Sequence, residues 1–261
     1  MRECVVRDLG RMSYSGALAV QQRIAAERKQ GLGSDHLLFV EHPHVVTIGR
    51  NGHEENVLAP EETLRRAGIE LYETDRGGDV TYHGPGQLVG YPIVDLRGEW
   101  PGKRGPHLGP VDFVRLLEEA LIRTCADFGV MAKRIPKCTG VWTLGDEPTR
   151  DDKTVTNGAP NPSAIREKKL AAIGVHVSQA VTSHGFALNV TTDLGDFDWI
   201  VPCGIRDRGV TSLKLEADAR REPTMDRAIH ATARNFGRVF QRQMLWCDSI
   251  EQLLAPSGSR I

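Results

Sequence analysis

Residues 76–87 read R-G-G-D-V-T-Y-H-G-P-G-Q, a stretch that combines glycines with a cation, hydroxyls and an imidazole. Glycine lets backbone amides approach a ligand and adopt positive φ angles, while Arg76, Thr81 and His83 offer hydrogen-bonding groups of different reach. The apolar run at 88–96 follows directly and predicts a strand. A simple glycine-rich turn would explain the glycines but not the other side chains. The pattern therefore favours a ligand-binding segment that leads into a strand.

Three further motifs follow in order: K-L-A-A-I-G starts at Lys169, S-H-G-F-A-L-N-V at Ser183 and P-C-G at Pro202. Each of them alone is weak, because short motifs recur by chance. Together with residues 76–87 they resemble the octanoyl-[acyl-carrier-protein]:protein N-octanoyltransferases of lipoate biosynthesis, and the resemblance extends through most of the chain. Those enzymes share the fold of the biotin and lipoate protein ligases, so the resemblance implies this fold and an octanoyl-transferring activity.

Segments with helical and strand-like patterns alternate irregularly along the chain. The clearest helix starts at Pro110, where apolar residues recur at steps of four until Gly129 ends it. The complete prediction comprises helices at 15–30, 60–67, 110–129 and 223–244, strands at 37–40, 45–48, 88–96, 170–178 and 186–191, and a hairpin at 133–144. This mixture indicates an α+β fold with a mixed or antiparallel sheet flanked by helices.

Length and composition are those of one large domain. With 261 residues, of which 40% are hydrophobic, the chain can bury a substantial core. We expect a single octanoyltransferase-type catalytic domain over residues 1–261, with polar loops near 97–109 and 146–168. The second loop ends directly before Lys169, so it is either a lid over the site or a solvated insertion.

The charge balance and the cysteines narrow the choice of partners and compartment. The 33 basic and 34 acidic side chains create no overall field that would attract nucleic acid or a membrane surface. The first residues lack the apolar run of a signal peptide, and no later segment approaches membrane-spanning length, so we expect a cytoplasmic protein. Five scattered cysteines argue against a disulfide framework. Among them, Cys125 lies on the apolar face of the helix predicted at 110–129 and is interpreted as a core thiol.

The resemblance assigns the catalytic roles to Cys203 and Lys169. A thiolate attacks an acyl thioester readily, and a nearby cation stabilises the thiolate. The lysine amine then serves as general base for the incoming target lysine. The two residues are 34 positions apart, so contact between them is implied by the resemblance and not by the sequence. Lys168 is the competing candidate, but strand neighbours point to opposite faces and the K-x-A-x-I-G register selects Lys169. The plainer alternatives are a buried structural thiol and an ordinary surface lysine.

The same resemblance implies the substrate-binding residues. They fall in three segments, and the small and apolar side chains of the last two suit a tunnel for a medium-length alkyl tail. The predicted set is Arg76, Gly77, Gly78, Asp79, Val80, Thr81, Tyr82, His83, Ala172, Ile173, Gly174, Gly185, Phe186 and Ala187. Backbone amides near Gly77, Gly78 and Gly204 are candidates for stabilising the tetrahedral oxyanion. His83 and His184 either position groups at the site or serve as hydrogen-bonded structural histidines.

We expect neither a cofactor nor a metal. No G-x-x-x-x-G-K-[ST] motif is present, and the G-P-G at 84–86 precedes a strand-like run instead of a helix, so P-loop and dinucleotide binding lack support. Metal-ligand spacings of the C-x-x-C or H-x-x-x-H kind do not occur among Cys138, His176, His184 and Cys203.

The expected partners are acidic carrier-type domains. The resemblance implies that the donor is octanoyl-acyl carrier protein and that the acceptors are the lipoyl domains of 2-oxoacid dehydrogenase complexes and the glycine cleavage H protein. Docking of acidic domains calls for a locally basic rim, with candidates at Arg97, Lys103, Arg104 and Arg134.

Three other functions stay open at this point. They are an ATP-dependent lipoate or biotin protein ligase, a non-catalytic lipoyl-domain-binding protein, and a thioesterase that uses Cys203 with a histidine. The P-C-G motif argues against the ligase, because an enzyme that activates a free acid as an adenylate needs no nucleophilic thiol. Acylation of Cys203 would separate the enzymes from the binding protein, and the release of free acid would identify the thioesterase.

Overall fold

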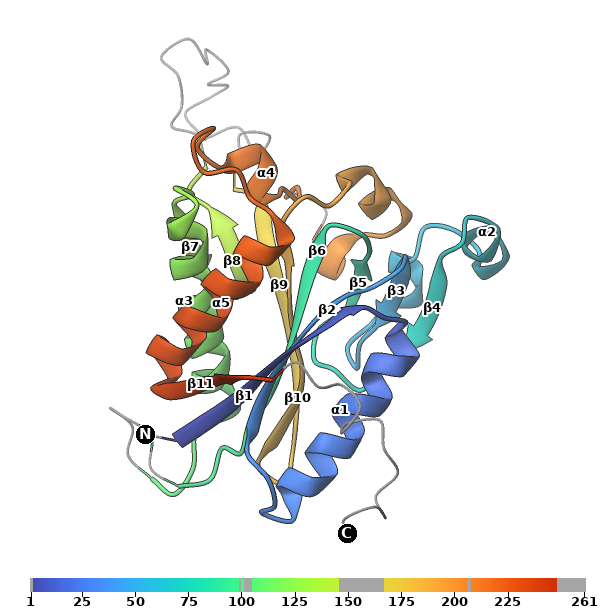
Figure 1. The fold of residues 1–261 in the computed structure, drawn as a ribbon. Helices are drawn as coiled ribbons and strands as arrows, with labels where there is room; N and C mark the ends of the chain where they lie inside the picture. The colour runs from blue at the N-terminus through green and yellow to red at the C-terminus, as the bar shows by residue number, and fades with distance from the viewer. Residues whose placement is uncertain (1, 99, 101–104, 146–166, 206–207, 248–261) are drawn as a thin grey trace.

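The computed structural model describes residues 2–98, 100, 105–145, 167–205 and 208–247 (Figure 1). Its strands are β1 (Arg2–Arg11), β2 (Asp35–Glu41), β3 (Val45–Ile48), β4 (Glu70–Glu73), β5 (Val80–His83), β6 (Gln87–Ile93), β7 (Ala132–Ile135), β8 (Cys138–Thr143), β9 (Lys169–Ser178), β10 (Val181–Asn189) and β11 (Arg242–Trp246). Its α-helices are α1 (Tyr14–Lys29), α2 (Glu61–Arg66), α3 (Pro110–Asp127), α4 (Leu213–Glu216) and α5 (Met225–Phe240). Short 3₁₀ turns, η1 (Glu54–Asn56), η3 (Leu194–Trp199) and η4 (Pro202–Gly204), connect some of them.

The strands form two sheets. The large sheet has the order β11-β1-β2-β6-β10-β9-β8-β7, and the small sheet has the order β4-β3-β5. The large sheet is mixed, because β1 runs parallel to β2 and β11 while its other described pairs are antiparallel. Helices α3 and α5 lie together on one side of it, and α1 and the small sheet lie on the other (Figure 1). This architecture confirms the predicted α+β fold with a mixed sheet flanked by helices.

Alternate residues of the central strands contribute to two separate cores. On β2, Leu37 and Phe39 belong to the cluster that includes α3 and α5, whereas Leu38 and Val40 pack with α1. Successive side chains of a strand point to opposite faces, so a strand that is covered on both faces is apolar at every position. The continuous run at 37–40 therefore marks a strand in the middle of the molecule.

The helices predicted next to these cores are confirmed. Helix α1 is capped by Ser13, whose hydroxyl accepts a hydrogen bond from the amide of Gly16 at 3.2 Å. Helix α3 has Pro110 in its first turn and stops before Gly129, which adopts φ = 79°. Cys125 on the inner face of α3 is fully buried, and burial raises the pKa of this thiol to about 12. It is the core thiol that the sequence predicts.

The prediction for the C-terminal region is wrong in one respect. The single helix expected at 223–244 ends at Phe240, because Gln241 adopts the left-handed φ of 52° and the chain continues as β11. Strand β11 pairs in parallel with β1, which the sequence analysis did not predict as a strand. Strand β11 has its partner at the opposite end of the chain, and β1 lies between β11 and β2. Local patterns carry no information on the pairing of β11 with β1.

The two predicted loops differ in how far the structure describes them. In the loop near 97–109, Trp100 is buried and its indole N–H donates to the Leu96 carbonyl at 3.0 Å, so this residue packs into the core, while residues 99 and 101–104 lie outside the described residues. Most of the loop near 146–168 lies outside the described residues. None of the helices that the structure describes combines the length and apolarity needed to cross a bilayer.

Candidate active site

Lys169 and Cys203 meet in the folded chain. Lys169 is the first residue of β9, and its Nζ donates a hydrogen bond to the Sγ of Cys203 at 3.0 Å. The side chain of Lys169 is buried, whereas that of the neighbouring Lys168 is exposed. The choice of Lys169 over Lys168 from strand alternation therefore agrees with the geometry.

Backbone pairing and an aromatic ring fix the position of Lys169. Its amide donates to the Gly209 carbonyl at 2.9 Å, and its carbonyl accepts from the Thr211 amide at 3.0 Å. Its Nζ lies 4.7 Å from the ring centroid of the buried Trp142, a cation–π contact. The ammonium group of Lys169 thus contacts the Trp142 ring and donates its hydrogen bond to the Cys203 sulfur. No sequence pattern pointed to Trp142, because its position beside Lys169 depends on the pairing of β8 with β9.

Cys203 sits in a strained turn. Its φ of 55° and ψ of 22° are left-handed, a conformation that costs a residue with a Cβ about 1–2 kcal/mol. Such strained residues cluster at functional sites, where the surrounding structure holds them. The preceding Val201 amide donates to the Asn56 carbonyl at 2.7 Å, and a Cβ at the following Gly204 would come within 2.7 Å of an Asp79 carboxylate oxygen. The glycine of the P-C-G motif is therefore needed where the turn meets the 76–79 segment.

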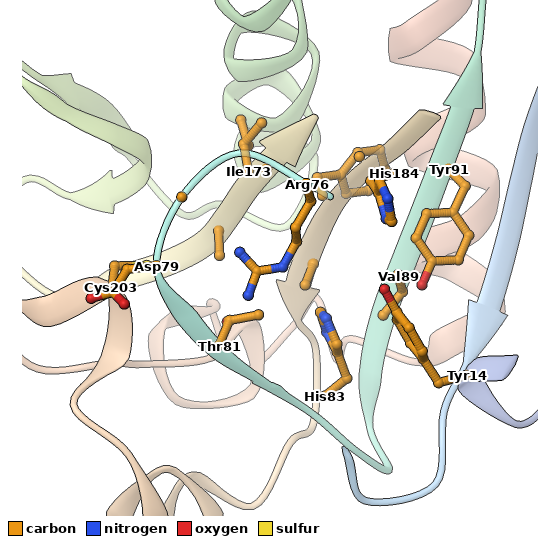
Figure 2. Close-up of a pocket in the computed structure, with 16 residues that line it drawn as sticks. Tyr14, Arg76, Asp79, Thr81, His83, Val89, Tyr91, Ile173, His184 and Cys203 are labelled. Atoms are coloured by element: carbon orange, nitrogen blue, oxygen red, sulfur yellow. The ribbon is translucent and has the colours of Figure 1, made fainter. Parts of the chain in front are cut away.

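A pocket opens beside Cys203, between the large sheet and the 76–83 segment. Its empty volume, including the part open to solvent, is about 460 Å³. Figure 2 shows Cys203 and Asp79 at one end, Arg76 in the middle, and Tyr14 and Tyr91 at the other end. A second, smaller cavity is bordered by both Cys203 and Lys169. Cys203 therefore borders both cavities.

Small residues form the floor of the larger pocket. Neighbouring strands place Gly174 beside Gly185, and Ala172 beside Ala187. The next strand adds Val89, which pairs with Ala187. A floor of glycine, alanine and valine offers room and an apolar surface for an alkyl chain.

The structure brings together most of the predicted binding residues. Those that line the pocket are Arg76, Gly78, Asp79, Thr81, His83, Ala172, Ile173, Gly174, Gly185, Phe186 and Ala187. Val80 and Tyr82 do not line it, because alternation along β5 turns them into the small core with Val46 and Phe197. Gly77 also lies outside the lining, and its amide donates to the Val175 carbonyl at 3.0 Å. The assignment of these three residues as substrate contacts stays a prediction.

Both histidines of the pocket have partners within the protein. The Nδ1 of His83 lies 2.7 Å from the Gln87 Oε1, while the Gln87 amide nitrogen donates to the side-chain oxygen of Asn189 at 2.9 Å. His83 Nδ1 is therefore the donor, and burial lowers the pKa of His83 to about 3, so the ring is neutral. The His184 Nε2 lies 2.6 Å from an Asp75 carboxylate oxygen, and burial lowers the pKa of His184 as well. Of the two interpretations, these contacts favour hydrogen-bonded structural histidines.

Sequence reasoning missed the residues at the far end of the pocket. Tyr91 donates its hydroxyl hydrogen to His42 Nε2 at 2.8 Å, since the His42 Nδ1 donates to the Met12 carbonyl at 2.7 Å. Tyr91 shares a sheet face with Val89, so alternation within the predicted strand 88–96 would have been a usable signal. Tyr14 at the start of α1 had no such signal.

Two further expectations concern metals and docking. Within the part of the chain that the structure describes, no three histidine, cysteine or acidic side chains gather into a possible metal site. Arg97 pairs with Asp95 at 2.7 Å, and Arg134 pairs with Glu119 at 2.8 Å, so each already has an acidic partner. Lys103 and Arg104 lie outside the described residues.

Comparisons with known proteins agree with this geometry. A family model described as the lipoyl protein ligase A/B catalytic domain matches residues 13–237. An octanoyltransferase of Acidobacterium capsulatum is 55% identical over 247 residues, which cover 94% of each chain. An octanoyltransferase of Solibacter usitatus is 50% identical over 245 residues, which cover 94% of this chain and 96% of the relative.

Solved structures with the same fold are lipoate protein ligases. The bi-partite lipoate protein ligase of Thermoplasma acidophilum has a TM-score of 0.71 at 17% identity, covering 97% of this chain and 90% of its own. A lipoate-protein ligase A bound with ATP has a TM-score of 0.68 at 16% identity, and the match covers 97% of this chain and 92% of the ligase chain. At such identities the likeness establishes the fold alone, and it confirms the ligase-like architecture that the sequence motifs imply.

Proposed function

This chain belongs to the lipoyl protein ligase A/B catalytic domain family, and we propose that it transfers an octanoyl group from acyl carrier protein to lipoyl domains through a thioester on Cys203. Relatives at 46–55% identity are octanoyltransferases, so the chain is an octanoyltransferase of lipoate biosynthesis. The observation that carries the proposed mechanism is the 3.0 Å contact between Lys169 Nζ and Cys203 Sγ.

In the first step Cys203 accepts the acyl group. The thiol proton moves to the amine of Lys169, and the resulting thiolate is stabilised by the ammonium. The sulfur attacks the carbonyl carbon of the carrier thioester, and the carbonyl electron pair moves onto oxygen. Collapse of this intermediate breaks the bond to the carrier sulfur, which takes the proton from the Lys169 ammonium and leaves as a thiol, so that Lys169 returns to its amine form. Because one thioester replaces another, the acyl group stays activated.

In the second step a lysine of the lipoyl domain takes the acyl group. Its amine must be neutral to attack, and Lys169 in its amine form removes a proton during that attack. A nitrogen–carbon bond forms, the bond to Cys203 breaks, and the thiol of Cys203 is regenerated.

The oxyanion donors are fewer than the sequence suggests. The Gly77 amide donates to the Val175 carbonyl, and the Gly204 amide donates to the Val201 carbonyl, at 3.0 Å in both cases. These two amides are engaged within the fold. Of the three glycine amides considered, Gly78 in the pocket lining is therefore the one that we propose for this role.

The donor and acceptor proteins form part of the proposal. Octanoyl-acyl carrier protein fits a pocket with an apolar floor that ends at a nucleophilic thiol, and lipoyl domains fit the family of the chain. The five cysteines are free thiols, which suits the reducing cytoplasm that we propose as the compartment.

We expect transfer to proceed without nucleotide. The thioester is already activated, so octanoyl-acyl carrier protein and an apo lipoyl domain should give octanoylated product at the same rate with or without ATP and magnesium, measured by intact-mass spectrometry. Free octanoate should give no product under either condition. A strict requirement for ATP, with free octanoate as a competent donor, would establish the ligase reaction in place of the transferase.

A further inference from the structure

Arg76 is a buried cation whose described hydrogen-bond partners are all neutral. It is 7% exposed. Its Nε and Nη2 donate to the Thr47 hydroxyl at 3.0 and 2.8 Å, Nη2 donates to the Thr47 carbonyl at 2.6 Å, and Nη1 donates to the Gly77 carbonyl at 3.1 Å. Among the described residues it forms no ion pair with a carboxylate. A buried charge without a counter-charge is expensive, so its retention here calls for an explanation.

The fold holds this guanidinium in a fixed place inside the pocket. A Cβ at Gly49 would come within 2.8 Å of its Nη1, and a Cβ at Gly78 within 3.4 Å, so glycines keep the space around it. Figure 2 shows the guanidinium in the middle of the pocket, between Thr81 and Ile173 and on the side of Cys203. Its hydrogen bonds orient the group, while its positive charge faces the pocket.

Most of the other titratable groups of the pocket are neutral. The remaining members of the lining that titrate are Tyr14, Asp79, His83, Tyr91, His184 and Cys203. Burial raises the pKa of both tyrosines and lowers the pKa of both histidines, so these four groups are neutral near pH 7. Within this lining the cation is Arg76 and the carboxylate is Asp79, held by the His53 amide at 2.8 Å and the Asn56 side chain at 2.6 Å. Just beside the lining lie the Lys169 amine, next to Cys203, and the Asp75 carboxylate, 2.6 Å from His184 Nε2. Cys203 is the group of this lining at which negative charge develops during acyl transfer, and Arg76 is the cation that shares the pocket with it.

We propose that Arg76 is the fixed counter-charge for the anionic states at Cys203, the thiolate and the oxyanion of the tetrahedral intermediates. This inference rests on the proposed function, because it takes Cys203 as the acyl acceptor. Lys169 contacts the sulfur and gains or loses a proton during the reaction. Arg76 keeps its charge throughout, because a guanidinium does not deprotonate in proteins. When Lys169 is a neutral amine in the second step, Arg76 is the cation that remains. It acts through its field on Cys203 and is therefore a positioning residue.

The test is the pH profile of Cys203 alkylation by iodoacetamide. The label is read for each peptide by mass spectrometry, because Cys138 and Cys247 are also partly exposed free thiols. Arg76→Gln should lower the alkylation rate of Cys203 at pH 7 about tenfold and move the half-maximal pH upward by about one unit. Arg76→Lys retains a cation and should stay within about threefold of the native rate. A purely structural role for Arg76 would not shift this profile.

The matched control is Arg50→Gln, which removes an exposed arginine next to the same segment. The Arg50 amide donates to the Arg76 carbonyl at 2.9 Å, and this backbone bond survives the substitution. The control should leave the profile unchanged, since an exposed charge is screened by solvent.

Two outcomes overturn the inference. One is an Arg76→Gln protein with native circular dichroism and a native alkylation profile. If Arg76→Gln does not fold, Arg76→Lys decides, and a shift of about one unit despite the retained cation overturns the inference equally. The octanoyl adduct separates this inference from the proposed function: a native protein that acquires no adduct refutes the function itself, whereas a native adduct with an unshifted Arg76→Gln profile refutes only the role of Arg76.

Discussion

Replacing Cys203 with serine is expected to abolish the octanoyl adduct and to slow transfer to the lipoyl domain by about 10³-fold or more. Sulfur at this position lies 3.0 Å from the Lys169 Nζ and can be held as a thiolate, whereas a serine hydroxyl is a much weaker nucleophile beside a lysine. Intact-mass spectrometry after incubation with octanoyl-acyl carrier protein, without an acceptor domain, measures the adduct. Single-turnover transfer after addition of the acceptor measures the second step.

Cys247→Ser is the matched control for this substitution. Cys247 is another partly exposed free thiol, and it lies at the end of β11, beyond the pocket lining. This variant should form the adduct and transfer it as the native protein does. An adduct of equal size in Cys203→Ser would locate the acyl acceptor elsewhere and remove the basis of the proposed mechanism.

The sequence predicts a helix or strand well where the apolar residues of that segment follow a helical or strand-like spacing. The apolar row of α3 and the two-faced apolar strand β2 follow from spacing alone, because each buries its own side chains. The pairing of β11 with β1 could not be predicted in this way. Its residues Arg2 and Arg242 meet only after the whole domain has closed, and the end of helix α5 depends on the left-handed Gln241.

The same distinction between local patterns and long-range packing applies to the candidate site. Motifs identify Lys169 and Cys203, and strand alternation selects Lys169 over its exposed neighbour. Alternation also explains the arrangement of β5, because consecutive strand residues point to opposite faces. Thr81 and His83 line the pocket, whereas Val80 and Tyr82 lie in the small core. Trp142 could not be found from the sequence, because no local feature connects it with Lys169.

Lys169→Ala is expected to slow both acylation of Cys203 and transfer to the acceptor, each by about 10²- to 10⁴-fold. The substitution removes the proton acceptor, and it also removes the cation that lies between Cys203 and the Trp142 ring. Stopped reactions analysed by intact mass give the two rates separately. Lys168→Ala, which truncates the exposed neighbour, should retain both rates. Native rates in Lys169→Ala would exclude the amine from the chemistry.

Lys169→Arg separates the two roles of the amine. Arginine retains the cation beside Cys203, so iodoacetamide alkylation and slow formation of the acyl-enzyme should be partly preserved. It does not deprotonate near neutral pH, so transfer from the preformed acyl-enzyme should fall by about 10²- to 10⁴-fold. The pocket residues that the structure describes offer no ready substitute, because burial lowers the pKa of His83 to about 3 and His184 is bound to Asp75. Transfer by Lys169→Arg at the native rate would therefore require the base to come from outside this pocket.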